Sequence, residues 1–254
     1  MAQLGLHRRD YPLHEVAPYI NWLYFFHAWG FAPKYIPSPN LCECESCRRL
    51  WVSRFPLAEQ PKANEAVRLQ KEAWSMMNRL DAQFQTHATV RLMEGNASGN
   101  DLLLYLPEQD EPFLFPLLRQ QSGNPPFLCL NDFIRPLGKG RDVIGAFATT
   151  VDEEMEQLYP DEADKRLLVQ TLADRLAEAT AERIHEEVRK ELWGYAADEN
   201  LSPQDLNDEK YQGIRPAVGY PSLPDISVNH LLYELTDMGS MGIRLTEHAM
   251  MQPH

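Results

Sequence analysis

The sequence has no long apolar run. Hydrophobic residues make up 44% of the 254 residues, but no stretch approaches the roughly 18 successive apolar residues that a membrane-spanning helix requires. The N-terminal segment MAQLGLHRRDYPLHEV has basic residues without the apolar core or the small-residue cleavage site of a secretory leader. We therefore expect a soluble globular protein of the cytoplasm, with no membrane partner.

The sequence also has few basic residues relative to its acidic ones. The chain has 24 lysines and arginines against 37 aspartates and glutamates, which gives a net charge of −13. Its isoelectric point is near 5.0. Such a chain repels the phosphate backbone of a nucleic acid, and no basic face interleaved with aromatic residues stands out. These features argue against nucleic-acid binding.

Cysteines are few, and three of the four lie close together in the sequence, at Cys42, Cys44 and Cys47. Four cysteines in a chain this long do not make a secretory disulfide framework, so we expect reduced thiols. Three thiolates at this CxCxxC spacing could hold zinc or an iron–sulfur cluster. Either needs a fourth ligand, for which distant histidines or Cys129 are the candidates. Metal sensing or electron transfer through this motif is one hypothesis for the chain.

Hydrophobic periodicity predicts helices on both sides of the middle of the chain. Dense apolar residues over 14–31 and apolar residues at three- and four-residue steps over 64–84 predict two helices. A strict four-residue step over 168–192 predicts the longest helix, which should end near Gly194. A last helix is expected near 228–236.

Short apolar runs separated by glycine and proline fill the middle of the chain and predict a sheet. ATVRLMEG and DLLLYLP, joined by NASGN, resemble a hairpin, and further strands are expected at FLFPLLRQQ, PFLCLNDFIRP and DVIGAFATTV, each short enough to be a helical turn instead. We predict an α+β fold with helices packed around a central antiparallel sheet, as a single domain over 1–254. Its parts would be a helical segment 1–86, a sheet region 88–151, and a long helix with a following loop region over 160–254.

The segment EKYQGIRPAVGYPSLPD, from Glu209 to Asp225, combines three prolines, two glycines, two tyrosines and one arginine. Proline fixes φ and glycine lets the backbone approach a ligand, so Arg215 and Tyr220 are expected on a rigid rim. The planar guanidinium of Arg215 would suit the carboxylate of a ligand. The alternative is a structural loop whose arginine pairs with a carboxylate of the core.

Several motifs together resemble the reactivation domain of cobalamin-dependent methionine synthase. They are YINWLYFFHAW, PKY, LRQQ, CLNDFIRP, IGAFATT, the long LADRLAEATAERIHEEVRKELWGYAADENLSPQDL segment and KYQGIRPAVGYPSLPD. These motifs follow the family's order over nearly the whole chain, and the resemblance is most specific at YQGIRPAVGYP. It implies the α+β fold of that domain.

The resemblance further implies a module that binds S-adenosylmethionine (AdoMet) and presents it to oxidised cobalamin carried by a partner. One-electron reduction by a flavodoxin-like donor and methyl transfer would then restore methylcobalamin, and the protein would mainly position the reactants. Such a chain is a component of a methyltransferase of methionine biosynthesis rather than a complete enzyme. Its partner is the cobalamin-binding domain or subunit of methionine synthase.

Site residues are implied in the same way. Arg215 would bind the AdoMet carboxylate, and Glu209 and Glu178 would line the charged end of the ligand. Tyr220 would lie at the corrin face, and Asp174 would accept the cobalt-ligand histidine displaced from the cobalamin domain. Without the resemblance, Asp174 and Glu178, four residues apart, would be read as a solvated acidic helix face. The other members of the implied cofactor site are Asn21, Pro216, Ala217 and Gly219.

Two features depart from the family pattern. Asn21 stands where the family has an aspartate before the tryptophan, so the AdoMet ammonium would meet a neutral amide, at a loss of about 1 kcal/mol. The family also continues beyond MMQPH through a small-residue motif and a tyrosine-containing strand that cover the adenosine. A rival hypothesis is therefore a degenerate protein that docks on a corrinoid protein, or binds another small molecule, without methyl transfer. The ExxH pair Glu182 and His185 is interpreted as a surface pair, because a second ExxH helix is absent.

Overall fold

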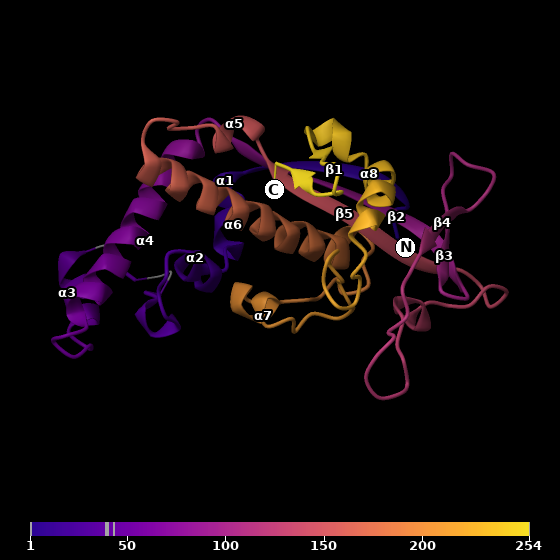
Figure 1. Ribbon diagram of the computed structural model, residues 1–254, viewed down its shortest axis with the longest axis horizontal. Helices are drawn as coiled ribbons and strands as arrows, with labels where there is room; N and C mark the ends of the chain where they lie inside the picture. Colours follow the sequence, from indigo (N-terminus) through magenta and orange to yellow (C-terminus); the bar gives the residue numbers. More distant parts are fainter. Residues whose placement is uncertain (1, 39–40, 43, 254) are drawn as a thin grey trace. The chain divides into compact units, whose positions relative to one another are not determined.

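A five-stranded sheet is the framework of the structure (Figure 1). Its strands are β1 (Gly5–Pro12), β2 (Gln85–Ser98), β3 (Asp101–Tyr105), β4 (Phe113–Pro116) and β5 (Asp142–Val151). They are ordered β1-β2-β3-β4, and β5 also pairs with β2. The computed structural model describes residues 2–38, 41–42 and 44–253.

The hairpin expected from the sequence is formed by β2 and β3. The two strands are antiparallel, and Ser98 pairs with Asp101, so Gly99 and Asn100 alone make the turn. Gly99 has a φ of +64°, which glycine adopts without steric cost. The turn is shorter than the five-residue NASGN because β2 continues through its first three residues.

Two details of the predicted sheet are wrong. The run PFLCLNDFIRP forms a 3-10 turn, Leu130–Phe133, which is the helical-turn alternative and not the expected strand. Asp132 accepts a hydrogen bond from the backbone N–H of Cys129 at 2.9 Å and binds Arg119 with both carboxylate oxygens at 2.7 Å, and these contacts fix the turn. Strand β1 was not expected, since GLHRRDYP lacks an apolar face and buries only one of its residues.

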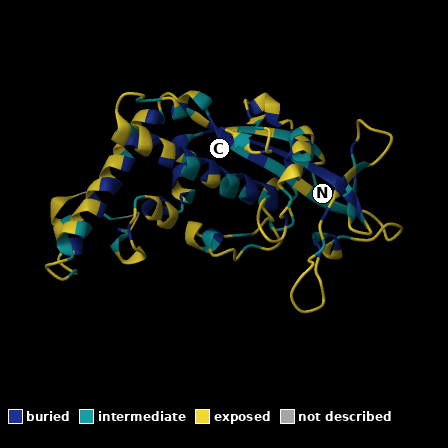
Figure 2. Ribbon diagram, viewed as in Figure 1, coloured by how far each residue is buried: buried dark blue, intermediate teal, exposed yellow. Residues whose placement is uncertain are grey.

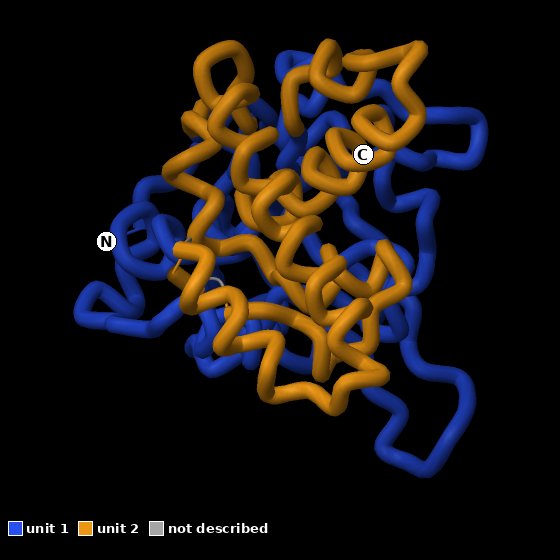
Figure 3. Tube along the Cα trace, turned by 90° about the vertical axis from the view of Figure 1, so that its left-hand side faces the viewer, with its two compact units in different colours: residues 1–9, 87–150, 181–253 blue, residues 10–86, 151–180, 254 orange. Residues whose placement is uncertain are grey.

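The chain divides into two compact units, each made of separate segments (Figure 3). The first unit comprises residues 1–9, 87–150 and 181–253, and the second includes residues 10–86 and 151–180. The long helix α6 (Ala163–Glu187) contributes residues to both. It continues as a π-helical turn over Val188–Leu192 and ends before Gly194, as the sequence predicts.

The first unit packs an apolar core against strands β2 to β4 and the helix α8 (Asn229–Thr236). Its buried members are Met93, Leu102, Leu104, Leu106, Phe115, Leu117, Cys129, Leu223, Val228 and Leu235. The short helix α7 (Pro203–Asn207) and the two-stranded ribbon of β6 (Arg244–Leu245) and β7 (Met251–Gln252) also belong to this unit. Leu223 and Val228 tie the segment after the proline-rich loop into the core.

The second unit is helical. It contains α1 (Leu13–Val16), α2 (Trp22–Ala28), α3 (Glu45–Val52), α4 (Gln60–Leu80) and α5 (Glu153–Glu156). The helix predicted over 64–84 is α4, which begins and ends four residues earlier. The single helix predicted over 14–31 is wrong: a 3-10 turn over Ala17–Tyr19 interrupts it, and α2 begins anew with Asn21 as its N-cap. Pro18 lies in that turn and has no backbone N–H to continue a helix.

The predicted fold class is confirmed: helices are mixed with a curled antiparallel sheet. Buried residues follow the sheet and the inner faces of α4 and α6, and the long loops are exposed (Figure 2). Within the described residues, no helix combines the length and the apolarity that crossing a membrane requires.

Candidate functional site

Two glycines shape the proline-rich loop that follows α7. Gly213 has a φ of +105°, and a Cβ there would lie 3.0 Å from the hydroxyl of Tyr195. That hydroxyl donates to the carbonyl of Gln212 at 3.1 Å. Gly219 has a φ of +87°, and its N–H donates to the carbonyl of Leu223 at 2.9 Å. The loop is therefore held by its own backbone and by Tyr195.

Arg215 points into the first unit and pairs with α6. Its Nη2 donates to Oε1 of Glu182, and the two side chains are 21% and 14% exposed. Its Nη1 reaches the carbonyl of Ala181 and Nδ1 of His185, both at 3.5 Å, the outer limit of a hydrogen bond. Burial acts to lower the pKa of Arg215, but the Glu182 carboxylate outweighs it and the net pKa is raised. The alternative that the sequence left open, an arginine paired with a carboxylate of the fold, is thus present in the structure.

Tyr211 lies at the centre of the groups around Arg215. The guanidinium of Arg215 is 5.6 Å from the Tyr211 ring centroid and that of Arg189 is 4.7 Å from it. The ring of His185 meets it edge-on at 4.7 Å. Both guanidinium groups thus lie over the Tyr211 ring, within cation–π range. We call these six residues the Tyr211 cluster: Glu182, His185, Arg189, Glu199, Tyr211 and Arg215.

The second arginine of the cluster, Arg189, is fully buried and binds Glu199 in bidentate fashion. Its Nε lies 2.8 Å from Oε2 and its Nη2 lies 2.5 Å from Oε1 of Glu199, which is 8% exposed. Nη1 of Arg189 and Oε2 of Glu182 are buried and have no hydrogen-bond partner among the described residues. The positive charges of the two arginines and the negative charges of the two carboxylates therefore cancel around the neutral ring of Tyr211.

None of the cluster except Arg215 was assigned to the site from the sequence. The interpretation of Glu182 and His185 as a surface pair is wrong, because His185 is buried and Glu182 is only 14% exposed on its side chain. A signal was present: Glu182, His185 and Arg189 follow at three- and four-residue steps and so share a helix face.

His185 is held neutral by its surroundings. Burial, followed by the charges of Arg189 and Arg215, lowers its pKa to about 3. In the unfolded chain the pKa of histidine is about 6.5. Because the folded-state pKa lies below the unfolded value, the stability from neutral His185 is fully present above pH 6.5 and is lost as the pH falls toward 3.

His185→Gln should therefore flatten the acid dependence of stability. Between pH 6.5 and 5.0 the wild type is expected to lose roughly 1.5 kcal/mol more unfolding free energy than the variant. Urea denaturation at several pH values measures this, with exposed His230→Gln as the matched control. If the unfolding free energy of wild type and His185→Gln depends on pH in the same way, the pKa of His185 does not change on unfolding.

The other residues expected on the loop are exposed. Tyr220 is 65% exposed and makes an isolated bridge with Leu223. Pro216, Ala217 and Gly219 are exposed as well, and so is Glu209, which has a φ of +55°. Glu209 nevertheless contributes to the raised pKa of Arg215, so its charge acts on the same region. Within the first unit, Arg215 therefore has Glu182 as its partner, and the other residues predicted on the loop are exposed.

The remaining predicted residues belong to the second unit. Asn21 is the N-cap of α2, and its Oδ1 accepts a hydrogen bond from the backbone N–H of Leu23 at 3.1 Å. On α6, Asp174 is half-buried and Glu178 is exposed, with Oε2 of Glu178 2.9 Å from Nη1 of Arg175. The capping role of Asn21 could not be read from the family resemblance.

The three clustered cysteines also lie in the second unit. Their sulfur atoms are all within 4.8 Å of one another. Hydrogen bonds from Ser46 and Cys47 lower the pKa of the Cys44 thiol to about 6, while the hydrogen bond with Cys44 raises the pKa of Cys47 to about 11. The predicted ligands are thus brought together, without Cys129, which is buried in the first unit.

A cavity of about 260 Å³ opens in the second unit between α4 and α6. It is lined by Trp29, Phe31, Glu65, Arg68, Leu69, Glu72, Asp164, Lys165 and Leu168. None of the residues that the sequence assigned to a site lines it. We therefore place the candidate site at the loop and not at this cavity.

Comparison with known proteins agrees with the fold and identifies the family. The chain is similar to a solved structure, the crystal structure of the MetH reactivation domain bound to AdoHcy, with a TM-score of 0.84 and 34% sequence identity. The match covers 99% of this chain and 76% of that one. The model of the activation domain of vitamin B12-dependent methionine synthase matches residues 12–254. The chain belongs to this activation-domain family, which confirms the resemblance found in the sequence.

Proposed function

We propose that this chain binds AdoMet and presents it to the oxidised cobalamin of a partner corrinoid domain for reductive methylation. The observation that carries the proposal is Arg215, a half-buried guanidinium on a rigid loop, in a chain 34% identical to a domain solved with AdoHcy. AdoHcy is AdoMet without the sulfonium methyl group, so the two share the carboxylate, ammonium and adenosine groups that a site would recognise. AdoMet would supply the methyl group.

The contacts of Arg215 leave hydrogen-bonding capacity at Nη1 for a ligand. Nη2 is engaged with Glu182, but both contacts of Nη1 are at 3.5 Å and contribute little. A ligand carboxylate can therefore accept from Nη1 while Glu182 holds Nη2 and orients the guanidinium plane. Glu182 would act as a positioning residue, and neutral His185 would add no further charge beside the ligand.

An exposed aromatic residue on the same loop would contact the corrin of the partner. Tyr220 projects from the turn over 217–223 and is 65% exposed. A large exposed aromatic ring on a rigid turn suits contact with the flat face of a corrin. As the family resemblance implies, Asp174 would accept the displaced cobalt-ligand histidine, and Glu178 would line the charged end of AdoMet.

Isothermal calorimetry with AdoMet tests the proposal most directly. We expect saturable binding of one AdoMet per chain, and we expect AdoHcy to compete for it. If neither ligand binds while the protein is folded, the chain is instead the degenerate docking protein of the rival hypothesis. Asn21, whose amide replaces a carboxylate, is the feature that favours this rival.

Asn21→Asp should strengthen AdoMet binding by about 1 kcal/mol, because a charge-assisted hydrogen bond to the ligand ammonium replaces a neutral one. The gain is nearly tenfold in affinity. Aspartate and asparagine are equally good N-caps, so the bond to the Leu23 N–H and the fold should be kept.

Calorimetry of both proteins checks this prediction, with thermal denaturation to verify that the variant folds. Asn64→Asp, on the exposed face of α4, is a matched control for the added charge. Equal affinities for wild type and Asn21→Asp would place the AdoMet ammonium elsewhere.

The partner and the electron donor are proposals of the same kind. The family's description points to a cobalamin-binding partner. A flavodoxin-like electron donor and a cytoplasmic location are what we expect from the sequence. Addition of the chain to a separate cobalamin-bearing methionine synthase fragment, with AdoMet and reduced flavodoxin, should restore the methylcobalamin spectrum.

We also propose that the chain is one domain. The elements β1, β2, β5 and α6 each contain residues of both compact units, so neither unit has a complete set of elements. We expect a single cooperative thermal transition, with calorimetric and van't Hoff enthalpies that agree. Two resolved thermal transitions would instead show that the two compact units unfold separately, as two domains.

A further inference from the structure

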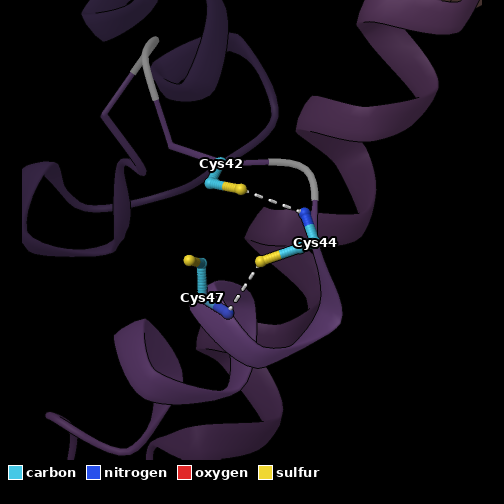
Figure 4. Close-up of side chains that lie close together, drawn as sticks. All are labelled: Cys42, Cys44 and Cys47. Carbon is cyan, nitrogen blue, oxygen red and sulfur yellow. Dashed lines mark hydrogen bonds between the residues drawn. The ribbon is translucent and has the colours of Figure 1, made fainter.

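The CxCxxC motif lies outside the proposed AdoMet site and has no assigned role. Figure 4 shows the sulfur atoms of Cys42, Cys44 and Cys47 facing a common space beside the start of α3, and all three lie within 4.8 Å of one another. Cys42 and Cys44 are exposed and Cys47 is half-buried.

The backbone already directs these sulfur atoms. Cys44 is the N-cap of α3, and its Sγ accepts from the N–H of Cys47 at 3.4 Å. The N–H of Cys44 in turn donates to Sγ of Cys42 at 3.4 Å. These two contacts orient the sulfur atoms of Cys42 and Cys44 before any metal ion binds.

The motif is anchored on both sides by one small core. Trp51 and Val52 of α3 pack with Ala63 and Val67 of α4, and Leu41, directly before Cys42, packs against the same cluster. Two points of attachment to a single core limit how far the three thiols can separate. The arrangement is therefore partly organised before any ligand binds.

We propose that Cys42, Cys44 and Cys47 bind one zinc ion through three thiolates, with the fourth coordination position taken by a ligand from outside this group. Zinc with bonds of about 2.3 Å to sulfur places tetrahedral thiolates about 3.8 Å apart, so the sulfur atoms need to close by at most about 1 Å. Among the described residues no fourth cysteine, histidine or carboxylate joins the group. A four-cysteine iron–sulfur cluster would need one more cysteine, and none joins this group in the part of the chain that the structure describes. Binding releases the remaining thiol protons to solvent.

The test uses the full chain, reduced, freed of metal with a chelator and titrated with zinc against a chromophoric competitor. We expect one zinc per chain. Replacement of any one of the three cysteines by serine should weaken binding at least about tenfold, since even loss of a supporting second-shell partner weakens metal sites 10- to 100-fold. Cys129→Ser, in the first unit, is the matched control and should bind as the wild type does.

Two further measurements identify the ligands and the geometry. Cobalt substitution should give a thiolate-to-cobalt charge-transfer band and the intense visible bands of four-coordinate cobalt. Zinc should also slow alkylation of Cys42, Cys44 and Cys47, mapped by mass spectrometry. The proposal fails if the reduced, folded protein takes up no zinc, or if the serine variants bind zinc as tightly as the wild type.

Discussion

Arg189→Met should lower the free energy of unfolding by about 3–5 kcal/mol, because it leaves a buried carboxylate without its partner. Arg189 is completely buried and holds Glu199 with contacts of 2.8 and 2.5 Å. Methionine fills much of the same volume, so the lost charge rather than a cavity dominates the effect. Chemical denaturation of the two proteins measures it.

Two companion variants separate the buried pair from a general loss of charge on the helix. Lys190→Met removes the neighbouring cation, whose pairing with Glu186 at 3.3 Å is more exposed, and should change stability by no more than about 1 kcal/mol. The double variant Arg189→Met with Glu199→Leu removes both charges and should recover much of the lost stability. A double variant as unstable as Arg189→Met would show that the arginine acts through packing on Tyr211 instead.

Local patterns were enough to predict the main helices. The four-residue step along α6 and its π-helical extension is buried at Leu168, Leu172, Leu176, Thr180, Ile184, Val188 and Leu192. Apolar residues at four-residue steps lie within about 40° of their neighbours around a helix, so this pattern predicts a helix without any tertiary information. The β2–β3 hairpin was predictable for a similar reason, because the glycine turn separates two apolar runs.

Failures of prediction occur where polar side chains override the apolar pattern. Asp132 turns CLNDFIRP into a capped 3-10 turn although the segment is apolar enough for a strand. Pro18 and the cap of Asn21 divide a helix that composition alone makes continuous. Strand β1 is recognised only by its pairing with β2, since its own side chains alternate without an apolar face.

The candidate site was predicted in part. The sequence identified Arg215 and its loop, yet it gave no means of choosing which carboxylate the guanidinium binds. Asp174 was expected to accept the displaced histidine and Glu178 to line the ligand, and no carboxylate was named for Arg215, which the structure pairs with Glu182. That choice depends on how the loop returns to α6, about 30 residues away in sequence, which local patterns do not encode.

Arg215→Ala should weaken AdoMet binding by about 1.5–3 kcal/mol, the contribution of a hydrogen bond to a charged group. This corresponds to roughly 10- to 100-fold in affinity. Arg215→Lys should recover only part of it, since a single ammonium cannot present two separate nitrogen donors, one to Glu182 and one to the ligand carboxylate, in a fixed plane. Calorimetric titration with AdoMet measures each variant.

Glu182→Gln distinguishes a ligand-binding arginine from a structural one, because it breaks the ion pair from the other side. The amide keeps one acceptor for Nη2 but removes the competing charge, so Arg215 becomes a stronger partner for the ligand carboxylate. We therefore expect Glu182→Gln to destabilise the fold about as much as Arg215→Ala does, yet to keep or improve AdoMet affinity. If the ion pair is purely structural, both variants lose stability and neither changes affinity in the folded protein. Equal loss of affinity in both would instead mean that the pair holds the loop in its binding shape, and that Arg215 does not itself contact the ligand.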